Sequence, residues 1–264
     1  MSDPKTILIT GATGGIGSAL ADVYAGSGQT LILFGRDRSR LQQVADRCRH
    51  AGAHVETESI DVRDTDALRE RLDQISERFP PDMVIVNAGI IGDIGADAEG
   101  ESWEAIERIV QVNLTAALAT ADAVLPAMRR RGSGQIVFIS SMSAYFGLPL
   151  TPTYAATKAA LKSYAEGWRG WLAPERIGVT AVMPGFVESD MSRQFPGPRP
   201  FLITAERSAT IIKRRLRRNP ARISFPFPLN FGMWWLAVLP PAVSLRILGV
   251  LGYVPHGNES NSRQ

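Results

Sequence analysis

The sequence predicts an α/β fold, a doubly wound parallel sheet of about seven strands with helices on both faces. Three observations lead to this prediction. Short apolar runs alternate with segments of helical pattern along most of the chain. The segment MVIVNAG opens as a continuous apolar run, as expected of a strand that is buried on both faces. A glycine-rich turn joins the first apolar run to the first helical segment. Strands and helices that alternate at this rhythm imply parallel strands with right-handed crossovers.

The first part of the chain supplies four strands. KTILIT is a short apolar strand, and the helix SALADVYAGSG follows the glycine-rich turn. LILFG is the second strand, and the helix after it ends at Gly52. HVETESIDV is predicted as the third strand, and it leads into the helix ALRERLDQISERF and then into the strand MVIVNAG.

The same alternation continues further along the chain. A long helix is expected from about Trp103 to Arg131, and we expect Pro126 to kink or end it, because proline removes a backbone hydrogen bond. Strand QIVFISS, helix 152–172 and strand IGVTAVMPG follow. A basic amphipathic helix is predicted over 204–218, and RISFPF is the last strand, which its proline stops at a sheet edge.

Composition bounds the kind of protein. A chain of 264 residues that is 45% hydrophobic can bury a full core, and no composition shift divides its first 190 residues. The start, MSDPKTILIT, has no charged region followed by a long apolar stretch, so a secretory signal is not expected. Cys48 is the only cysteine, which excludes an internal disulfide and suits a reducing, cytoplasmic compartment. The three histidines show no ligand spacing, so no metal site is expected.

The net charge is only +3, but it is unevenly placed. The segment KRRLRRNPAR, residues 213–222, carries six basic residues and no acid. The rest of the chain therefore sums to about −3. A uniformly basic nucleic-acid binder would look different, so no nucleic-acid partner is expected. An anionic partner would have to meet this one patch.

Four glycines, Gly11, Gly14, Gly15 and Gly17, lie between the first strand and its helix. Glycine at this place permits a tight turn and a close backbone approach to a pyrophosphate, whose charge lies at the helix N-terminus. An ordinary glycine-rich turn is the alternative. The position directly between strand and helix favours nucleotide binding, and hence a Rossmann-type sheet that holds a dinucleotide.

The end of the second strand bears on the choice of dinucleotide. A fold that selects NAD usually has an acid here for the ribose 2′-hydroxyl, but this chain has Gly35 and Arg36. An arginine can pair with a 2′-phosphate, which an acid would repel. We therefore expect NADP(H) to be preferred, with NAD(H) as the second cofactor. The alternative is that Arg36 and Arg38 belong to a solvated loop.

Tyr154 and Lys158 lie four residues apart in TYAATKAALKSYAEG, a segment rich in helix-forming residues. Side chains at this spacing project from the same face of a helix. We expect the lysine ammonium to stabilise the phenolate and to lower the tyrosine pKa. Such a phenol can exchange a proton with a carbonyl oxygen near neutral pH. The pair alone is a weak signal, because it occurs by chance on many helices.

Together these residues resemble the short-chain dehydrogenase/reductase family, in its shorter subclass of about 250 residues. The resemblance covers roughly Lys5 to Met191 and rests on TGATGGIG, Asp61-Val62, Asn87-Ala88-Gly89, Asn113, Ser141 with Tyr154 and Lys158, and Pro184-Gly185. It implies a cofactor site formed by Gly11, Thr13, Gly15, Ile16, Gly17, Arg36, Asp61, Val62, Asn87, Ala88, Gly89, Tyr154, Lys158, Pro184, Gly185, Val187 and Ser189. Ser189 departs from the family's usual threonine, but a serine hydroxyl can keep that hydrogen bond.

The resemblance also implies roles for Asn113, Ser141, Tyr154 and Lys158. The cofactor would supply the hydride while the protein orients the carbonyl and handles the proton. Tyr154 would donate or accept that proton, and Lys158 would lower the Tyr154 pKa and hold the nicotinamide ribose. Ser141 would hydrogen-bond the carbonyl oxygen, and Asn113 would anchor a water that links the lysine to solvent. Singly, each residue could instead end a strand, satisfy helix backbone or form a turn.

Two alternative assignments compete with this expectation. The extended subclass of the same superfamily also satisfies the glycine motif, but its enzymes add a sizeable C-terminal substrate domain, and only about 70 residues follow Met191. The other rival is a catalytically silent NADP-binding regulator or scaffold, since a fold alone does not establish activity. The pairing of Tyr154 with Lys158 argues against a regulator. We therefore expect a ketone or aldehyde reductase, or the reverse alcohol dehydrogenase.

The C-terminal part departs from the family. We expect a catalytic domain over 1–228, an apolar extension over 229–254 and a disordered tail over 255–264. Pro240-Pro241 divides the extension into two short helices, and no uninterrupted stretch reaches the length of about 20 residues that a spanning helix needs.

Two interpretations of the extension lead. The helices either cap the substrate cleft or pack in a subunit interface, or they dip into a bilayer, with membrane contact through 213–251. Both favour an apolar or lipid-like carbonyl substrate. The resemblance further implies a homodimer or homotetramer, formed through the long helices around Asn113 and Tyr154.

Overall fold

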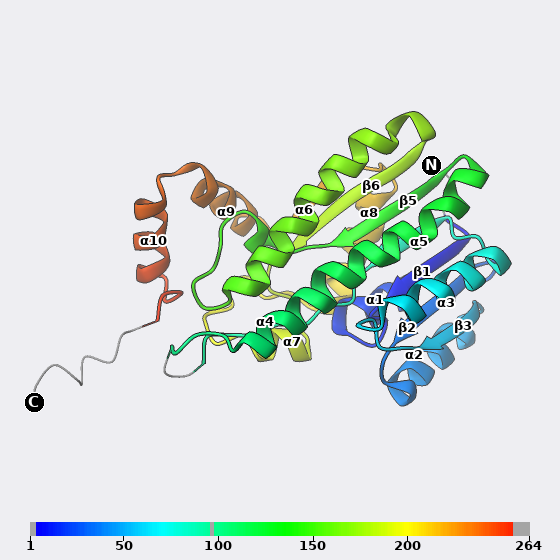
Figure 1. Ribbon diagram of the computed structural model, residues 1–264, viewed down its shortest axis with the longest axis horizontal. Helices are drawn as coiled ribbons and strands as arrows, with labels where there is room; N and C mark the ends of the chain where they lie inside the picture. The colour runs from blue at the N-terminus through cyan, green and yellow to red at the C-terminus, as the bar shows by residue number, and fades with distance from the viewer. Residues whose placement is uncertain (1–3, 96–97, 256–264) are drawn as a thin grey trace, which may run out of the picture.

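The computed structural model describes residues 4–95 and 98–255. At its centre is a seven-stranded sheet in the order β3-β2-β1-β4-β5-β6-β7, with every pairing parallel (Figure 1). The strands are β1 (Thr6–Thr10), β2 (Thr30–Gly35), β3 (His54–Ser59), β4 (Met83–Val86), β5 (Gly134–Ile139), β6 (Ile177–Pro184) and β7 (Arg222–Phe225). The predicted fold class and strand count are therefore confirmed.

The helices follow the predicted order. They are α1 (Gly15–Tyr24), α2 (Arg38–His50), α3 (Thr65–Arg78), α4 (Trp103–Val110), α5 (Ala116–Arg131), α6 (Pro152–Leu172), α7 (Asp190–Arg193), α8 (Ala205–Leu216), α9 (Leu229–Val238) and α10 (Pro241–Val250). The bounds of α6 agree with the prediction. The short helix α7 was not predicted. The predicted tail lies outside the described residues, apart from Pro255.

Alternate side chains of the strands bury two separate cores, one on each face of the sheet. On one face, Ile7 and Ile9 of β1 pack with residues of α1, α2 and α8. On the other face, Leu8 of the same strand packs with residues of α3, α5 and α6. This arrangement explains why the central strands are apolar at successive positions, since both of their faces are covered.

The order of the strands places a crevice at the carboxyl ends of β1 and β4. From β1 the chain moves outward through β2 to β3, and then returns to add β4 on the other side of β1. The loops after β1 and β4 therefore diverge to opposite faces of the sheet. Open α/β sheets bind ligands in the crevice formed at such a reversal.

The long helical region differs from the prediction. Pro126 lies inside α5, which continues to Arg131, so the proline does not end the helix. Regular α-helix is instead interrupted at Gln111–Thr115, which form one π-helical turn between α4 and α5. By length and composition alone, Trp103–Arg131 could cross a membrane. Half of its most apolar 18-residue stretch, however, is buried inside the protein.

The C-terminal extension forms two short helices, α9 and α10, on either side of the Pro240-Pro241 step, as predicted. They stand at the end of the molecule opposite β3 and α2 (Figure 1). The Ser244 hydroxyl donates to the Leu236 carbonyl at 2.8 Å and ties the two helices together. Their inner side chains, Met233, Leu236 and Leu248, join a third apolar cluster with the loops that follow β5 and β6.

Candidate active site

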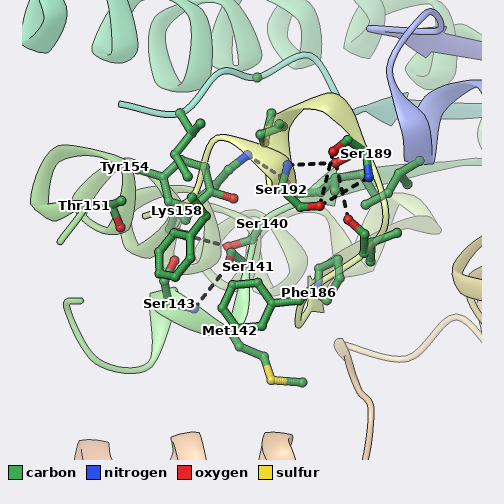
Figure 2. Close-up of a pocket in the computed structure, with 18 of the residues that line it drawn as sticks. Ser140, Ser141, Met142, Ser143, Thr151, Tyr154, Lys158, Phe186, Ser189 and Ser192 are labelled. Carbon is green, nitrogen blue, oxygen red and sulfur yellow. Dashed lines mark hydrogen bonds between the residues drawn. The ribbon is translucent and has the colours of Figure 1, made fainter. Parts of the chain in front are cut away.

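One cavity of about 1050 Å³ runs along the carboxyl ends of the strands, from the loop after β2 to helices α9 and α10. Figure 2 shows side chains from the loops after β5 and β6, and from α6, that line its middle. The cavity collects almost all the residues that the sequence assigned to a site. Gly17 and Asn113 are the exceptions, because both lie behind its wall.

The glycine loop after β1 has a backbone that other residues could not form. Gly11 has a φ of +65°, and a Cβ at Gly17 would lie only 2.2 Å from the Gly11 carbonyl oxygen. The Asn87 amide donates to the Thr10 and Gly11 carbonyls at 3.1 and 3.0 Å, so the loop is fastened to the end of β4. Gly17 therefore packs closely behind the loop, while Thr13 and Gly14 at the tip of the loop line the cavity.

The loop after β2 forms the charged end of the cavity. Arg36, which directly follows the strand, lines this end together with Thr13 and Asp61. A Cβ at Gly35 would lie 2.9 Å from a Thr13 side-chain carbon, so glycine is needed where the loops after β1 and β2 meet. Hydrogen bonds from Arg63 lower the pKa of Asp61 and keep this carboxylate ionised.

A second arginine at this end was missed by the sequence analysis. Arg40 lies on the first turn of α2, where its backbone N–H donates to the capping side chain of Asp37 at 3.0 Å. Its guanidinium forms an ion pair at 3.1 Å with Asp190 of α7, and all three residues line the cavity. The contact joins positions 150 residues apart in the sequence, so no local pattern could have revealed it.

The loop after β6 closes the cavity opposite the glycine loop. This loop supplies Gly185, Val187 and Ser189 of the predicted residues, and Pro184 is the last residue of β6. Gly185 N–H donates to the Phe225 carbonyl at 2.8 Å, which fixes the start of the loop against β7. The Ser189 hydroxyl accepts from the backbone N–H of Ser192 at 3.1 Å and caps α7. A Cβ at Gly15 would lie 2.8 Å from the Ser189 Cβ, so the two loops touch.

Three polar side chains, Ser141, Tyr154 and Lys158, meet at the centre of the cavity, and we refer to them as the Tyr154 trio. Tyr154 and Lys158 project from one face of α6, and Ser141 follows β5 (Figure 2). The Ser140 hydroxyl donates to the Lys158 carbonyl at 2.7 Å, which holds α6 against the end of β5. The Lys158 ammonium lies 5.6 Å from the centre of the Tyr154 ring and donates to the Ile139 carbonyl at 2.9 Å.

The electrostatics of this trio differ from the expectation. Burial raises the pKa of Tyr154, and a hydrogen bond with Ser141 lowers it in part. The expected lowering of the Tyr154 pKa by Lys158 is absent, because the ammonium lies over the ring and donates its hydrogen bond to the Ile139 carbonyl. Burial also lowers the pKa of Lys158 to about 8. Burial is thus the main cause of the pKa shifts of both Tyr154 and Lys158, rather than a neighbouring charge.

Asn113 is buried behind the trio, in the π-helical turn. Its side-chain oxygen accepts from the Ile90 N–H at 2.8 Å, and its NH₂ donates to the Ile90 carbonyl at 2.9 Å and to the Thr157 hydroxyl at 3.2 Å. A Cβ at Gly89 would lie 3.4 Å from both the Asn113 oxygen and the Lys158 nitrogen. Asn113 therefore holds the loop after β4 against α6, beside Lys158.

Beyond the trio the cavity becomes apolar. Its lining there comes from the loops after β5 and β6 and from the extension: Met142, Leu148, Phe186, Phe195, Leu229, Met233, Leu236, Leu248 and Tyr253. Phe186 and Phe195 pack with their ring centres 5.1 Å apart. The Tyr253 hydroxyl donates to the Pro198 carbonyl at 2.9 Å and fastens the end of the extension to the loop after α7. No motif marks these residues, which come together only through the fold.

Two buried hydroxyls also line the cavity. Within the described residues, the side-chain oxygens of Ser143 and Thr151 have no hydrogen-bond partner. Both are labelled in Figure 2, which draws them among the residues that line the cavity. A buried hydroxyl without a partner is costly, so these two groups are available to a polar group of a bound molecule.

The buried lysine gives a prediction that concerns stability. Lys158→Met is expected to raise the free energy of unfolding at pH 7, by at most about 3 kcal/mol, because the charged ammonium is buried at a cost. The lost bond to the Ile139 carbonyl reduces this gain. The folded-state pKa of about 8 lies below the ordinary 10.5, so the unfolded chain binds more protons between these values. The wild type therefore gains stability over that pH range.

Thermal unfolding of both proteins at pH 7 and at pH 10 checks this. The melting temperature of Lys158→Met should exceed that of the wild type most at pH 7, and the gap should narrow towards pH 10. A wild type that is the more stable protein at pH 7 would show that the buried ammonium does not destabilise the fold.

The cavity fits a dinucleotide on its own geometry. It pairs a glycine loop, held at a helix N-terminus, with an arginine-rich rim and a long groove that ends at the Tyr154 trio. Backbone N–H groups at such a loop suit phosphate, and the rim suits further negative charge.

Comparisons with known proteins agree with this geometry. Residues 5–198 match the profile of the family described as short chain dehydrogenase. An uncharacterised oxidoreductase of Myxococcus xanthus is 35% identical over 237 residues, which cover 89% of this chain and 93% of that protein. The 3-oxoacyl-[acyl-carrier-protein] reductase of Thermotoga maritima is 31% identical over 194 residues, which cover 73% of this chain and 78% of that protein.

A solved structure resembles the whole chain. The short-chain dehydrogenase from Sphingobium yanoikuyae, in complex with NADPH, superposes with a TM-score of 0.77 at 27% identity. The match covers 97% of this chain and 98% of that one, so the likeness extends through the C-terminal extension.

Proposed function

The chain belongs to the short-chain dehydrogenase family, and we propose that it interconverts an uncharged, apolar ketone or aldehyde and its alcohol with NADP(H), using Tyr154 as the general acid/base. Family membership makes it an oxidoreductase that acts on CH–OH groups and takes a nicotinamide cofactor. One observation carries the finer proposal: a single cavity joins the glycine loop, the Tyr154 trio and an apolar lobe.

The residues at the centre of the cavity divide the work on the reacting oxygen. The bound nicotinamide supplies or accepts the hydride. The Tyr154 hydroxyl gives its proton to the oxygen as negative charge develops there, or accepts a proton in the oxidative direction. The Ser141 hydroxyl, already aligned with the phenol, donates a hydrogen bond to the same oxygen. Lys158 stands behind the tyrosine ring as the nearest positive charge.

With its raised pKa the Tyr154 phenol is protonated at neutral pH, as proton donation in the reductive direction requires. When the phenol gives up its proton, Lys158 is the positive charge that lies over the same ring. With a pKa of about 8, the lysine is still mostly charged at pH 7. Asn113 acts as a positioning residue, since its hydrogen bonds to Ile90 and Thr157 hold the loop after β4 and helix α6 together beside Lys158.

The distribution of charge along the cavity supports an uncharged substrate. Within the part of the chain that the structure describes, the charged side chains that line it, apart from Lys158, are at the nucleotide end: Arg36, Asp37, Arg40, Asp61 and Asp190. The lobe beyond Tyr154 offers aliphatic and aromatic side chains with the hydroxyls of Ser143 and Thr151. A substrate carboxylate or phosphate would be buried there without a cationic partner in the lobe, which is costly.

A substrate panel tests the proposal. NADPH oxidation is followed with a medium-chain methyl ketone and with a 2-keto acid of equal length, and each assay is repeated with NADH. The ketone should be reduced with a kcat/KM at least about 100-fold higher than that of the keto acid, since the buried carboxylate costs several kcal/mol. NADPH should serve better than NADH. Equal turnover of the keto acid would refute the apolar substrate, and preference for NADH would refute the cofactor assignment.

A further inference from the structure

The outer side of the C-terminal extension exposes large apolar side chains. Of the fourteen such side chains that are exposed in the described residues, ten lie between Phe227 and Leu251. Phe231, Trp234, Trp235 and Val238 recur at the spacing of one helical face on α9. On the neighbouring helix α10, Val243 and Val250 are exposed as well, and Val250 is 90% exposed. We refer to these six residues as the C-terminal apolar face.

The apolar character of α9 and α10 is not explained by their packing in the monomer. Their inner sides pack on the cavity through Met233, Leu236 and Leu248, while their outer sides, apart from Arg246, are largely apolar as well. The rings of Trp234 and Trp235 contact each other with centres 5.2 Å apart, yet both remain more than 40% exposed. A helix that is apolar all round is normally buried, so this outer side is expected to be covered in the working state.

The cavity reaches the C-terminal apolar face. Trp235, Ile247 and Leu251 line the cavity, and the same three side chains are exposed at the surface. The apolar lobe therefore opens among the exposed apolar side chains of α9 and α10. A molecule that leaves this lobe meets that surface before it meets bulk water.

The charge of the surrounding chain favours an anionic surface. Residues 207–255 contain eight basic side chains and no aspartate or glutamate, and one of the eight, Arg222, is paired at 2.6 Å with Glu166 of α6. One of them, Arg246, is exposed on α10 itself. The Arg215 guanidinium donates to the Ser224 carbonyl at 3.0 Å, and the Asn230 side chain at the start of α9 bonds the same residue. The basic end of α8 thus adjoins the first turn of α9.

We propose that the C-terminal apolar face docks on an anionic lipid bilayer, and that the cavity exchanges its carbonyl substrate with the lipid phase. The second part rests on the proposed function. Tryptophan pairs suit the headgroup boundary, and basic residues add attraction to anionic lipid. A second copy of the chain fits less well, because a symmetric contact would bring the acid-free segments against each other.

Vesicle flotation tests the docking. The full-length protein is mixed with phosphatidylcholine vesicles, with or without phosphatidylglycerol, and the floated fraction is measured. The wild type should float, and more strongly with the anionic vesicles at low salt than at high salt. The double variant Trp234→Glu/Val250→Glu should lower the partition coefficient by at least about tenfold, since each side chain loses its apolar burial. Neither residue lines the cavity, so its kcat/KM with a water-soluble ketone should match the wild type.

Trp103→Glu is the matched control, because Trp103 is 66% exposed on α4, outside the extension. It should float like the wild type. Equal loss of flotation in Trp103→Glu would show that the effect is not specific to the face. A wild type that floats with neither vesicle would overturn the proposal. If in that case light scattering shows a wild-type oligomer that the double variant breaks, a second copy covers the face.

Substrate delivery is tested separately from docking. With a long-chain ketone supplied in anionic vesicles, the double variant should lose most of its turnover, while its rate with the soluble ketone stays unchanged. Equal rates for wild type and double variant on the vesicle-borne ketone would refute exchange with the lipid phase. Flotation needs no turnover, so an inactive protein that still floats would contradict only the proposed function.

Discussion

Replacing Tyr154 by phenylalanine is expected to lower kcat/KM for carbonyl reduction by about 10³-fold, within the range that positioned acid catalysts contribute. The change removes only the hydroxyl that faces the cavity and hydrogen-bonds Ser141. The ring remains to pack beneath the Lys158 ammonium. Steady-state NADPH oxidation measures the loss, and NADPH fluorescence titration should show cofactor binding within a few-fold of the wild type.

Tyr164→Phe provides the matched control for that experiment. Tyr164 lies on the same helix, but its ring packs edge-on against Phe138, away from the cavity. This variant should keep wild-type kinetics. If Tyr154→Phe reduced every tested ketone as fast as the wild type, the proton would have to come from another group and the proposed chemistry would fail.

The exchange Arg36→Asp is expected to reduce the preference for NADPH over NADH by about 100-fold or more. The guanidinium directly follows β2 and lines the charged end of the cavity. An aspartate there would repel a 2′-phosphate and could accept a hydrogen bond from a 2′-hydroxyl, so the KM for NADPH should rise and that for NADH should fall. The preference is measured as the ratio of the two kcat/KM values.

Arg38→Asp distinguishes a specific contact from the general charge of this loop. Arg38 is exposed two positions further on, at the first residue of α2, and does not line the cavity. Its replacement should change the preference only a few-fold, through long-range attraction that salt screens. If both variants changed the cofactor preference equally, no single arginine would determine selectivity for the 2′-phosphate.

The sequence was sufficient for features that local patterns determine. The alternation of apolar strands and helices predicted the sheet, because both faces of each central strand are buried. The glycine loop was predictable because its backbone admits no side chain at Gly11 and Gly17. The Pro240-Pro241 step likewise marked the break between α9 and α10.

Other features depend on contacts between distant parts of the chain. Pro126 remains inside α5, since one missing N–H does not outweigh the packing of Val124 and Leu125 on the sheet. The Tyr154 pKa is raised because the fold encloses the ring, and the four-residue spacing to Lys158 carries no information about enclosure. Arg40, Phe195 and Tyr253 reach the cavity only after folding, from segments without a motif.

The two ends of the cavity have opposite chemical character. Exposed arginines mark one end, near α2, and exposed tryptophan and leucine mark the other, on α9 and α10. These helices lie at opposite ends of the molecule (Figure 1). On the proposed function, the nicotinamide cofactor enters at the arginine end and the apolar substrate at the end formed by α9 and α10. A protein docked on a bilayer through α9 and α10, as proposed, would exchange its cofactor at the opposite end many times without leaving the membrane.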